Sequence, residues 1–113
     1  MSKFFTFADR FVTCCFFGDG DEAYKITLTV CDDTDRKISE CADLFHKADA
    51  AKDFDARQKA YKKALIHLIG EDHVNALLSK TDNPDCFAIF EVYQYIINEY
   101  RDAKVKKLTA SAR

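Results

Sequence analysis

The sequence predicts an α+β fold, with an N-terminal β-hairpin or small antiparallel sheet followed by about four helices, the last one long. Residues 24–31 alternate apolar and polar side chains with a period of two, which is typical of a half-buried strand. Residues 34–108 instead repeat their apolar side chains every three or four positions, as amphipathic helices do. Strands that precede helices, with no internal repeat and no linker, indicate a single domain over residues 1–113.

Length, composition and charge restrict the class of protein. A chain of 113 residues is long enough to form a core without disulfides or metals. Its 48% hydrophobic and 32% charged residues are typical of a soluble globular protein. The formal net charge of −2 does not indicate a nucleic-acid or anionic-membrane partner.

The five cysteines favour a reducing compartment. They are odd in number and form no C-x-x-C pair. The first 17 residues lack both the cleavage site of a secretory signal and an uninterrupted apolar run of about 18 residues. We therefore expect reduced thiols in a cytoplasmic protein that does not span a membrane.

The strand region is expected to cover residues 3–31. Phe, Thr, Val and Cys predict a strand over Phe11–Phe17, with a shorter one around Phe4–Phe7. Asp19-Gly20 is a hairpin-turn signal because both positions can adopt positive φ. The second strand would bury one face, which carries Tyr24, Ile26, Leu28 and Val30. A two-stranded hairpin is marginally stable alone, so this face must pack against the helices.

The helical region is expected to cover residues 34–108, and its first two helices have recognisable starts. Residues 32–35 offer several acidic or hydroxyl N-caps for the first helix. The second is expected to open at Asp55, with Gln58 completing a capping box, and to end at Gly70. The apolar faces are Ile38, Cys41, Ala42, Leu44, Phe45 and Ala48 in the first helix, and Ala60, Tyr61, Ala64, Leu65, Leu68 and Ile69 in the second.

A short helix over Glu71–Ser79 precedes the long one. We expect the long helix to begin at Asn83-Pro84, with Asn as N-cap, and to extend to Leu108; its stretch from Phe87 to Leu108 alone is roughly 33 Å long. Its apolar arc ends at Ala103, so residues 104–113 are predicted to form a basic tail that frays. The core-facing side chains are Val74, Leu77 and Leu78 in the short helix, and Ile89, Phe90, Val92, Tyr93, Ile96, Ile97, Tyr100 and Ala103 in the long one.

No pattern predicts a metal or cofactor site. His67 and His73 are six positions apart across a glycine, and the adjacent Cys14 and Cys15 would point to opposite faces of a strand. The acidic runs at 19–22 and 32–35 lack the ligand spacing of a calcium loop. We expect no metal and no cofactor.

Catalysis is not indicated either. The chain has no glycine-flanked nucleophile turn and no phosphate-binding loop. The remaining catalytic alternative pairs Cys86 with His67 or His73, a combination that the sequence alone leaves open. We expect no catalytic residue and a protein that is not an enzyme.

Exposed aromatic side chains are the more informative feature. Phe87 and Tyr95 fall outside the apolar arc of the long helix. The phenylalanines of the first segment exceed what one face of a hairpin can bury; they are Phe4, Phe5, Phe7, Phe16 and Phe17. Either the helices cover both faces of the hairpin, or an aromatic surface is left for a partner.

Two stretches resemble the small tail assembly chaperones of long-tailed, siphovirus-type bacteriophages and prophages of Gram-positive bacteria. One is LIHLIGEDHVNALL at residues 65–78, a helix, a Gly-acid break and a short helix. The other is FEVYQYIINEY at residues 90–100, within the long helix. The resemblance covers about Tyr24 to Lys107 and leaves the Phe-rich first 17 residues without a counterpart.

The resemblance implies a non-virion protein that coats the apolar, helical tape measure protein, keeps it soluble and recruits tail tube subunits during tail morphogenesis. It implies a cytoplasmic location in an infected or lysogenic host, with no nucleic acid and no membrane as partner, and it leaves self-association open. The aromatic side chains expected to anchor the partner are Phe87, Tyr93, Tyr95 and Tyr100.

Two alternatives remain at the level of sequence. One is a structural virion protein, such as a tail-completion or head–tail joining subunit. The other is a small nucleic-acid-binding regulator that uses the basic residues Arg57, Lys59, Lys62 and Lys63 of the second helix.

Overall fold

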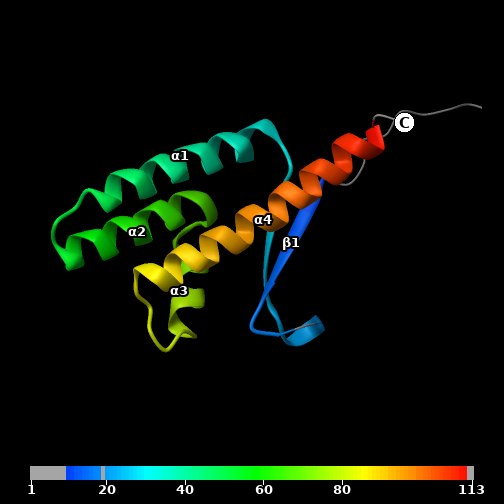
Figure 1. The fold of residues 1–113 in the computed structure, drawn as a ribbon. Helices are drawn as coiled ribbons and strands as arrows, with labels where there is room; N and C mark the ends of the chain where they lie inside the picture. The colour runs from blue at the N-terminus through cyan, green and yellow to red at the C-terminus, as the bar shows by residue number, and fades with distance from the viewer. Residues whose placement is uncertain (1–9, 19, 112–113) are drawn as a thin grey trace, which may run out of the picture.

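The computed structural model describes residues 10–18 and 20–111, which form a two-stranded antiparallel sheet followed by four α-helices (Figure 1). This confirms the predicted α+β fold. The elements are β1 (Phe11–Phe16), β2 (Tyr24–Thr29), α1 (Asp32–Asp49), α2 (Phe54–Ile69), α3 (Glu71–Ser79) and α4 (Cys86–Ser111). The strand expected around Phe4–Phe7 lies outside the described residues.

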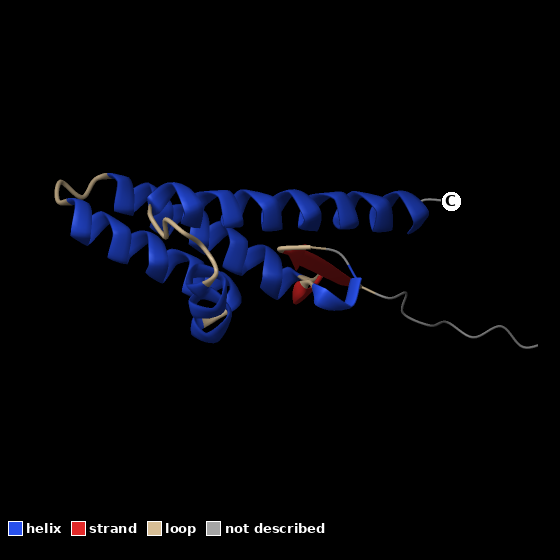
Figure 2. Cartoon of the chain, turned by 90° about the horizontal axis from the view of Figure 1, so that it is seen from below, coloured by secondary structure: helices blue, strands red, loops and turns tan. Residues whose placement is uncertain are grey.

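α4 packs against both parts of the fold: it contacts α2 in the helical layer and β1 in the hairpin. α1 and α2 run side by side, and α2 also contacts α3 and the first half of α4 (Figure 1). Beyond this helical layer α4 continues past the hairpin, where it contacts β1 (Figure 2). The molecule is therefore elongated, with principal extents of 65 × 32 × 19 Å.

The hairpin buries one face, as its alternation predicts. Val12 pairs with Leu28, Cys14 with Ile26 and Phe16 with Tyr24, and the β1 members of these pairs are at most 8% exposed. On the opposite face the hydroxyls of Thr13 and Thr27 are 3.1 Å apart.

The connection between the strands differs from the expected tight Asp19-Gly20 turn. The last pair is Phe16 with Tyr24, so residues 17–23 form the connection, with a 3₁₀ turn at Gly20–Glu22. Phe17 has a φ of 63°, and β1 therefore ends at Phe16, one residue earlier than predicted.

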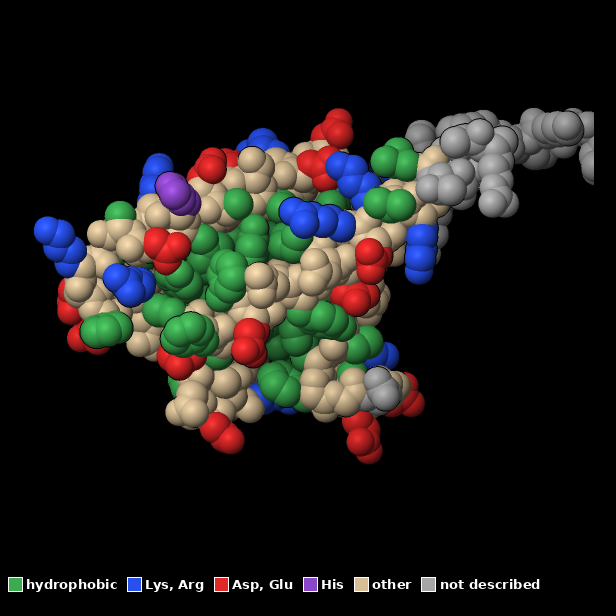
Figure 3. Space-filling model, in the orientation of Figure 1, with side chains coloured by type: hydrophobic (Ala, Val, Ile, Leu, Met, Phe, Trp, Pro, Cys, Tyr) green, Lys and Arg blue, Asp and Glu red, His purple; other side chains and the backbone are tan. Residues whose placement is uncertain are grey.

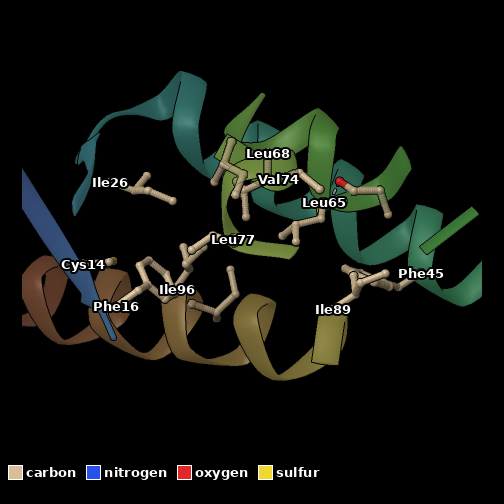
Figure 4. Close-up of a cluster of buried hydrophobic side chains, with 14 residues drawn as sticks. Cys14, Phe16, Ile26, Phe45, Leu65, Leu68, Val74, Leu77, Ile89 and Ile96 are labelled. Atoms are coloured by element: carbon tan, nitrogen blue, oxygen red, sulfur yellow. Dashed lines mark hydrogen bonds between the residues drawn. The ribbon is translucent and has the colours of Figure 1, made fainter. Parts of the chain in front are cut away.

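The core lies between the inner face of the hairpin and the helices (Figure 4). Phe16 and Ile26 of the hairpin meet Leu77 of α3 and Ile96 of α4 in one apolar cluster. Phe45, Leu65 and Ile89 extend this cluster between α1, α2 and α4. Of the predicted core positions, Ala42 and Phe90 are wrong, because Ala42 lies on the exposed side of α1 and Phe90 is 37% exposed.

Two tyrosines of α4 bind backbone groups of the strand region. The Tyr95 hydroxyl donates to Cys15 O (3.0 Å) and accepts from Cys15 N (3.2 Å). The Tyr100 hydroxyl donates to Asp35 Oδ1 (2.6 Å) and accepts from Cys31 N (3.3 Å). These bonds hold the hairpin and its link to α1 against α4, because buried backbone groups require such partners.

The predicted starts of α1 and α2 are wrong by one to four residues, whereas the predicted bounds of α3, Glu71–Ser79, are confirmed. Cys31 occupies the N-cap position of α1, ahead of the expected acidic run. Asp53, not Asp55, caps α2 by accepting from Ala56 N (3.4 Å). Gln58 does not complete a capping box, because its side-chain amide donates to Pro84 O (2.8 Å).

The start of α4 is likewise corrected. Asp85 caps the helix by accepting from Ala88 N (2.9 Å), and Cys86 is the first helical residue. The expected Asn83 cap and Pro84 first position are therefore wrong. Pro84 instead lies in the connection between α3 and α4, where its carbonyl oxygen accepts a hydrogen bond from the Gln58 side chain.

The tail expected to fray over residues 104–113 is helical as far as Ser111. Lys104 Nζ lies 2.7 Å from Asp35 Oδ2, so the end of the apolar arc is followed by an ion pair with α1. This pair links the far half of α4 to the start of α1.

Candidate functional site

A cleft of about 530 Å³ opens at one end of the helical layer, where α1 ends and both α2 and α4 begin. We term it the aromatic cleft. It is lined by Asp49 of α1, by Phe54, Arg57, Gln58 and Tyr61 of α2, and by Asp85, Cys86, Phe87 and Phe90 at the start of α4.

Three phenylalanines give the cleft its apolar character. Phe54 is 80% exposed, Phe87 79% and Phe90 37%. Figure 3 shows hydrophobic side chains exposed at this end of the molecule, among acidic and basic ones. Single exposed apolar residues are ordinary, but several around one concave surface are typical of an interaction site.

The exposure of Phe54 and Phe87 follows from their positions in the helices. Phe54 is the first residue of α2, and Phe87 is the second residue of α4. A helical side chain leans over the preceding turn, and residues at a helix start have no such turn to cover. Both rings therefore project beyond their helix ends into the opening.

The floor of the cleft is continuous with the core. Phe45, which is 4% exposed, makes edge contacts with the rings of Tyr61 (centroids 5.0 Å apart) and Phe90 (5.7 Å). Phe90 therefore rests on a fixed base and still presents part of its ring to the opening. A cleft with such a floor is formed before any ligand arrives.

Arg57 organises one wall. Its Nη2 donates to Ala51 O (2.9 Å), and its guanidinium carbon lies 5.8 Å from the centroid of the Phe54 ring. The guanidinium therefore makes a cation–π contact with the exposed Phe54 ring. Its Nε is buried and has no hydrogen-bond partner among the described residues.

The polar groups at the rim are engaged with each other. The Tyr61 hydroxyl donates to Asp49 Oδ1, and this bond to a carboxylate raises the pKa of Tyr61 to about 12. The phenol is therefore a neutral donor at physiological pH.

The cleft does not assemble the remaining catalytic alternative. Burial raises the pKa of Cys86, so its thiol is protonated at neutral pH. His67 Nε2 lies 3.5 Å from Glu40 Oε1, and His73 Nδ1 lies 2.7 Å from the Tyr24 hydroxyl. Neither histidine lines the cleft, so neither is placed to act as a base for Cys86.

Of the four predicted anchors, only Phe87 lies in the cleft. Tyr93 is half-buried with its ring 4.7 Å from that of Phe45. Tyr95 packs edge-on against Phe16 (5.1 Å). Tyr100 is 2% exposed, so its ring is not accessible to a partner in this structure. The hairpin, which covers Tyr95, explains why that ring falls outside the apolar arc.

Phe54 and Phe90 are lining residues that the sequence pattern did not single out. Phe54 is flanked by Asp53 and Asp55, so it resembles part of a charged loop. An isolated Phe beside an N-cap residue is the signal that would have identified it. Phe90 belongs to the apolar arc, which predicts a core position, yet part of its ring lines the cleft.

The four basic residues of α2 do not share one face. Arg57 lies in the cleft, whereas Lys59 and Lys63 are exposed and Lys62 is half-buried. At about 100° per residue, the three lysines fall on the side of the helix opposite Arg57. The arrangement therefore gives no continuous four-residue basic surface.

The described part of the chain has neither a metal-binding cluster nor a membrane-spanning helix. No group of three or more His, Cys, Asp or Glu side chains is placed to hold a metal ion there. No helix in it has the length and hydropathy needed to cross a bilayer.

Comparison of the chain with protein-family models, with curated proteins and with solved structures finds no match.

Proposed function

We propose that the protein is a phage tail assembly chaperone that receives an apolar helix of the tape measure protein in the aromatic cleft and recruits tail tube subunits. The cleft supports this proposal, because it offers aromatic rings and no assembled catalytic group. The resemblance of residues 65–78 and 90–100 to such chaperones supplies the identity of the partner.

The chemistry of the cleft suits reversible capture of an apolar helix. In helix-in-groove recognition, side chains from one face of an amphipathic helix enter an apolar groove. Large aromatic rings are the commonest energetic anchors of such contacts. Phe54 and Phe87 form the sides and Phe90 the floor, so side chains from one or two helical turns would contact all three.

A chaperone must also release its client, and the size of the cleft is consistent with that requirement. About 530 Å³ holds a few side chains, not a long helix. Contacts of this size belong to the weak and transient class. We therefore expect each engagement to be weak and the solubility of a long client to depend on several.

Co-expression with a fragment of the tape measure protein from the same phage genome tests the proposal. We expect the wild-type protein to keep the fragment soluble, and the double variant Phe54→Ser/Phe87→Ser to leave it insoluble. Phe17→Ser is the matched control, because Phe17 is 54% exposed on the hairpin, away from the cleft. Equal solubility with the wild type and the double variant would refute the assignment to the cleft.

Two further measurements test the identity of the partner. We expect the gene to lie between those of the major tail protein and the tape measure protein. We also expect the protein to be missing from purified virions. Its presence there would favour a structural virion subunit over a chaperone.

A further inference from the structure

The hairpin has an outer edge on each of its two strands, and the hydrogen bonds show which backbone groups face outward. Val30 N donates to Arg10 O (2.6 Å), which places residues 10 and 30 in a hydrogen-bonded pair. Such pairs alternate with non-hydrogen-bonded pairs along an antiparallel ladder. The odd-numbered residues of both strands therefore direct their backbone N–H and C=O groups away from the other strand.

The two outer edges differ. On β1 the Tyr95 hydroxyl of α4 bonds both backbone groups of Cys15, which closes that end of the edge. On β2 the outward backbone groups belong to Lys25, Thr27 and Thr29, and none of these groups has a hydrogen-bond partner among residues 10–18 and 20–111. Lys25 and Thr27 are also exposed. An open strand edge of this kind is a template for another strand.

We propose that β2 pairs with β2 of a second copy of this chain, antiparallel and across a twofold axis at Thr27, so that two hairpins form one four-stranded sheet. Thr27 then lies opposite Thr27 of the second copy, and Lys25 lies opposite Thr29. Each of these pairs exchanges two backbone hydrogen bonds. The inference concerns the hairpin, needs no client and does not rest on the proposed chaperone function.

The apolar side chains of β2 match this register. On the inner face Ile26 lies opposite Leu28 of the second copy, so the apolar face continues from one hairpin into the other. Ile26 is 2% exposed and Leu28 is half-buried, and the second strand covers the remaining surface of Leu28. On the outer face the two Thr27 side chains meet, and such threonine pairs are favourable across strands.

The charge on β2 selects the same register. Lys25 is the one charged side chain of the strand. In the proposed pairing the lysines of the two copies are four positions apart, at least about 13 Å at about 3.3 Å per residue. That separation exceeds the Debye length of about 8 Å at physiological ionic strength. A shift by two residues would place Lys25 opposite Lys25, where like charges destabilise the pair.

Such a contact uses the same surface on both copies and is therefore isologous. It closes at two chains, because each copy has then used its open β2 edge. The contact is small and largely made by backbone groups. We therefore expect the mass to rise from one chain to two with protein concentration, and no further.

Sedimentation velocity of charge variants at the twofold axis tests the inference. Thr27→Lys and Thr27→Asp each place like charges directly opposite one another, and we expect each to weaken the dimer about fivefold or more. An equal mixture of the two variants should restore dimers, because opposite charges then meet. Thr13→Lys is the matched control, since Thr13 pairs with Thr27 on the same face but lies on β1. It should dimerise as the wild type does.

Amide exchange locates the contact. The amides of Lys25, Thr27 and Thr29 should exchange more slowly as the protein concentration rises. Circular dichroism of each variant excludes unfolding as the cause of a lost dimer, and the Thr27 side chain is exposed, away from the core.

Four outcomes would overturn the inference. The wild type could remain monomeric at the highest concentration reached. Both Thr27 variants could dimerise as the wild type does. Their mixture could be no more dimeric than either variant alone. A dimer could form without any slowing of the three β2 amides, which would place the contact elsewhere.

Discussion

Asp35 is the residue that joins the start of α1 to the far half of α4. Its carboxylate accepts from the Tyr100 hydroxyl and pairs with Lys104. These two groups hold the pKa of Asp35 below its usual range. Both partners favour the charged form of the side chain, so the interaction depends on pH.

Asp35→Asn is expected to flatten the loss of stability in acid. A carboxyl whose pKa is lowered on folding stabilises the protein fully above its unfolded pKa of about 3.9 and loses this contribution as the pH falls through the lower folded pKa. Urea unfolding at neutral pH should show a loss of less than about 1 kcal/mol, because the pair is partly solvated.

The matched control for this measurement is Asp43→Asn. Asp43 is exposed on α1 and has no ion pair among the described residues. It should retain the wild-type dependence of unfolding free energy on pH below about pH 4. Identical acid profiles for Asp35→Asn and the wild type would contradict the role assigned to Asp35.

At the scale of elements, the hydroxyl of Tyr95 attaches the hairpin to α4. Tyr95→Phe removes the partner of both backbone groups of Cys15. We expect the free energy of unfolding to fall by about 1–2 kcal/mol, because partly buried backbone groups are then left unpaired. Chemical denaturation measures the loss, and amide exchange of β1 should show it locally.

Tyr93→Phe is the control for that variant. Tyr93 is also half-buried on α4, but no hydrogen bond of its hydroxyl is seen in the described part of the chain. Its substitution should change stability by less than about 0.5 kcal/mol. Equal losses in the two variants would mean that the ring and not the hydroxyl holds the hairpin.

The corrected start of α4 gives a second prediction at this scale. Asp85→Ala removes the bond to Ala88 N and should lower the unfolding free energy by about 1 kcal/mol. Asn83→Ala, at the position that the sequence favoured, should have almost no effect. Thermal unfolding of the two variants distinguishes the two caps. A larger loss of stability in Asn83→Ala than in Asp85→Ala would indicate that Asn83 is the cap.

Periodicity predicted the elements better than their ends. The bounds of α3 and the buried faces of β1 and β2 depend on local alternation, and the sequence contains that information. The start of α2 is less local: Asp53 caps it by accepting from Ala56 N, while Gln58, the expected capping-box partner of Asp55, donates to Pro84 O in another segment. A choice among neighbouring acidic residues is decided by such tertiary contacts.

The candidate site was predictable only in part, for a related reason. Phe87 falls outside the apolar arc, and that pattern alone identified it. Tyr95 falls outside the same arc but meets the hairpin. Phe54 is distant in sequence, and only the packing of α2 against α4 brings its ring to the same opening.

At the scale of the whole molecule, α4 connects the aromatic cleft to the hairpin. Its first turn lines the cleft, its middle contributes to the core, and its last turns carry a second apolar surface. A single helix therefore joins the cleft, the core and the exposed side chains of Val105 and Leu108.

The central claim is that the aromatic cleft binds the tape measure helix. Calorimetric titration of a tape measure peptide into the wild type and into Phe87→Ser tests it most directly. We expect Phe87→Ser to weaken the affinity by about 30-fold, the effect of a lost aromatic anchor worth about 2 kcal/mol, with unfolding free energy unchanged. An affinity equal to that of the wild type would contradict the claim.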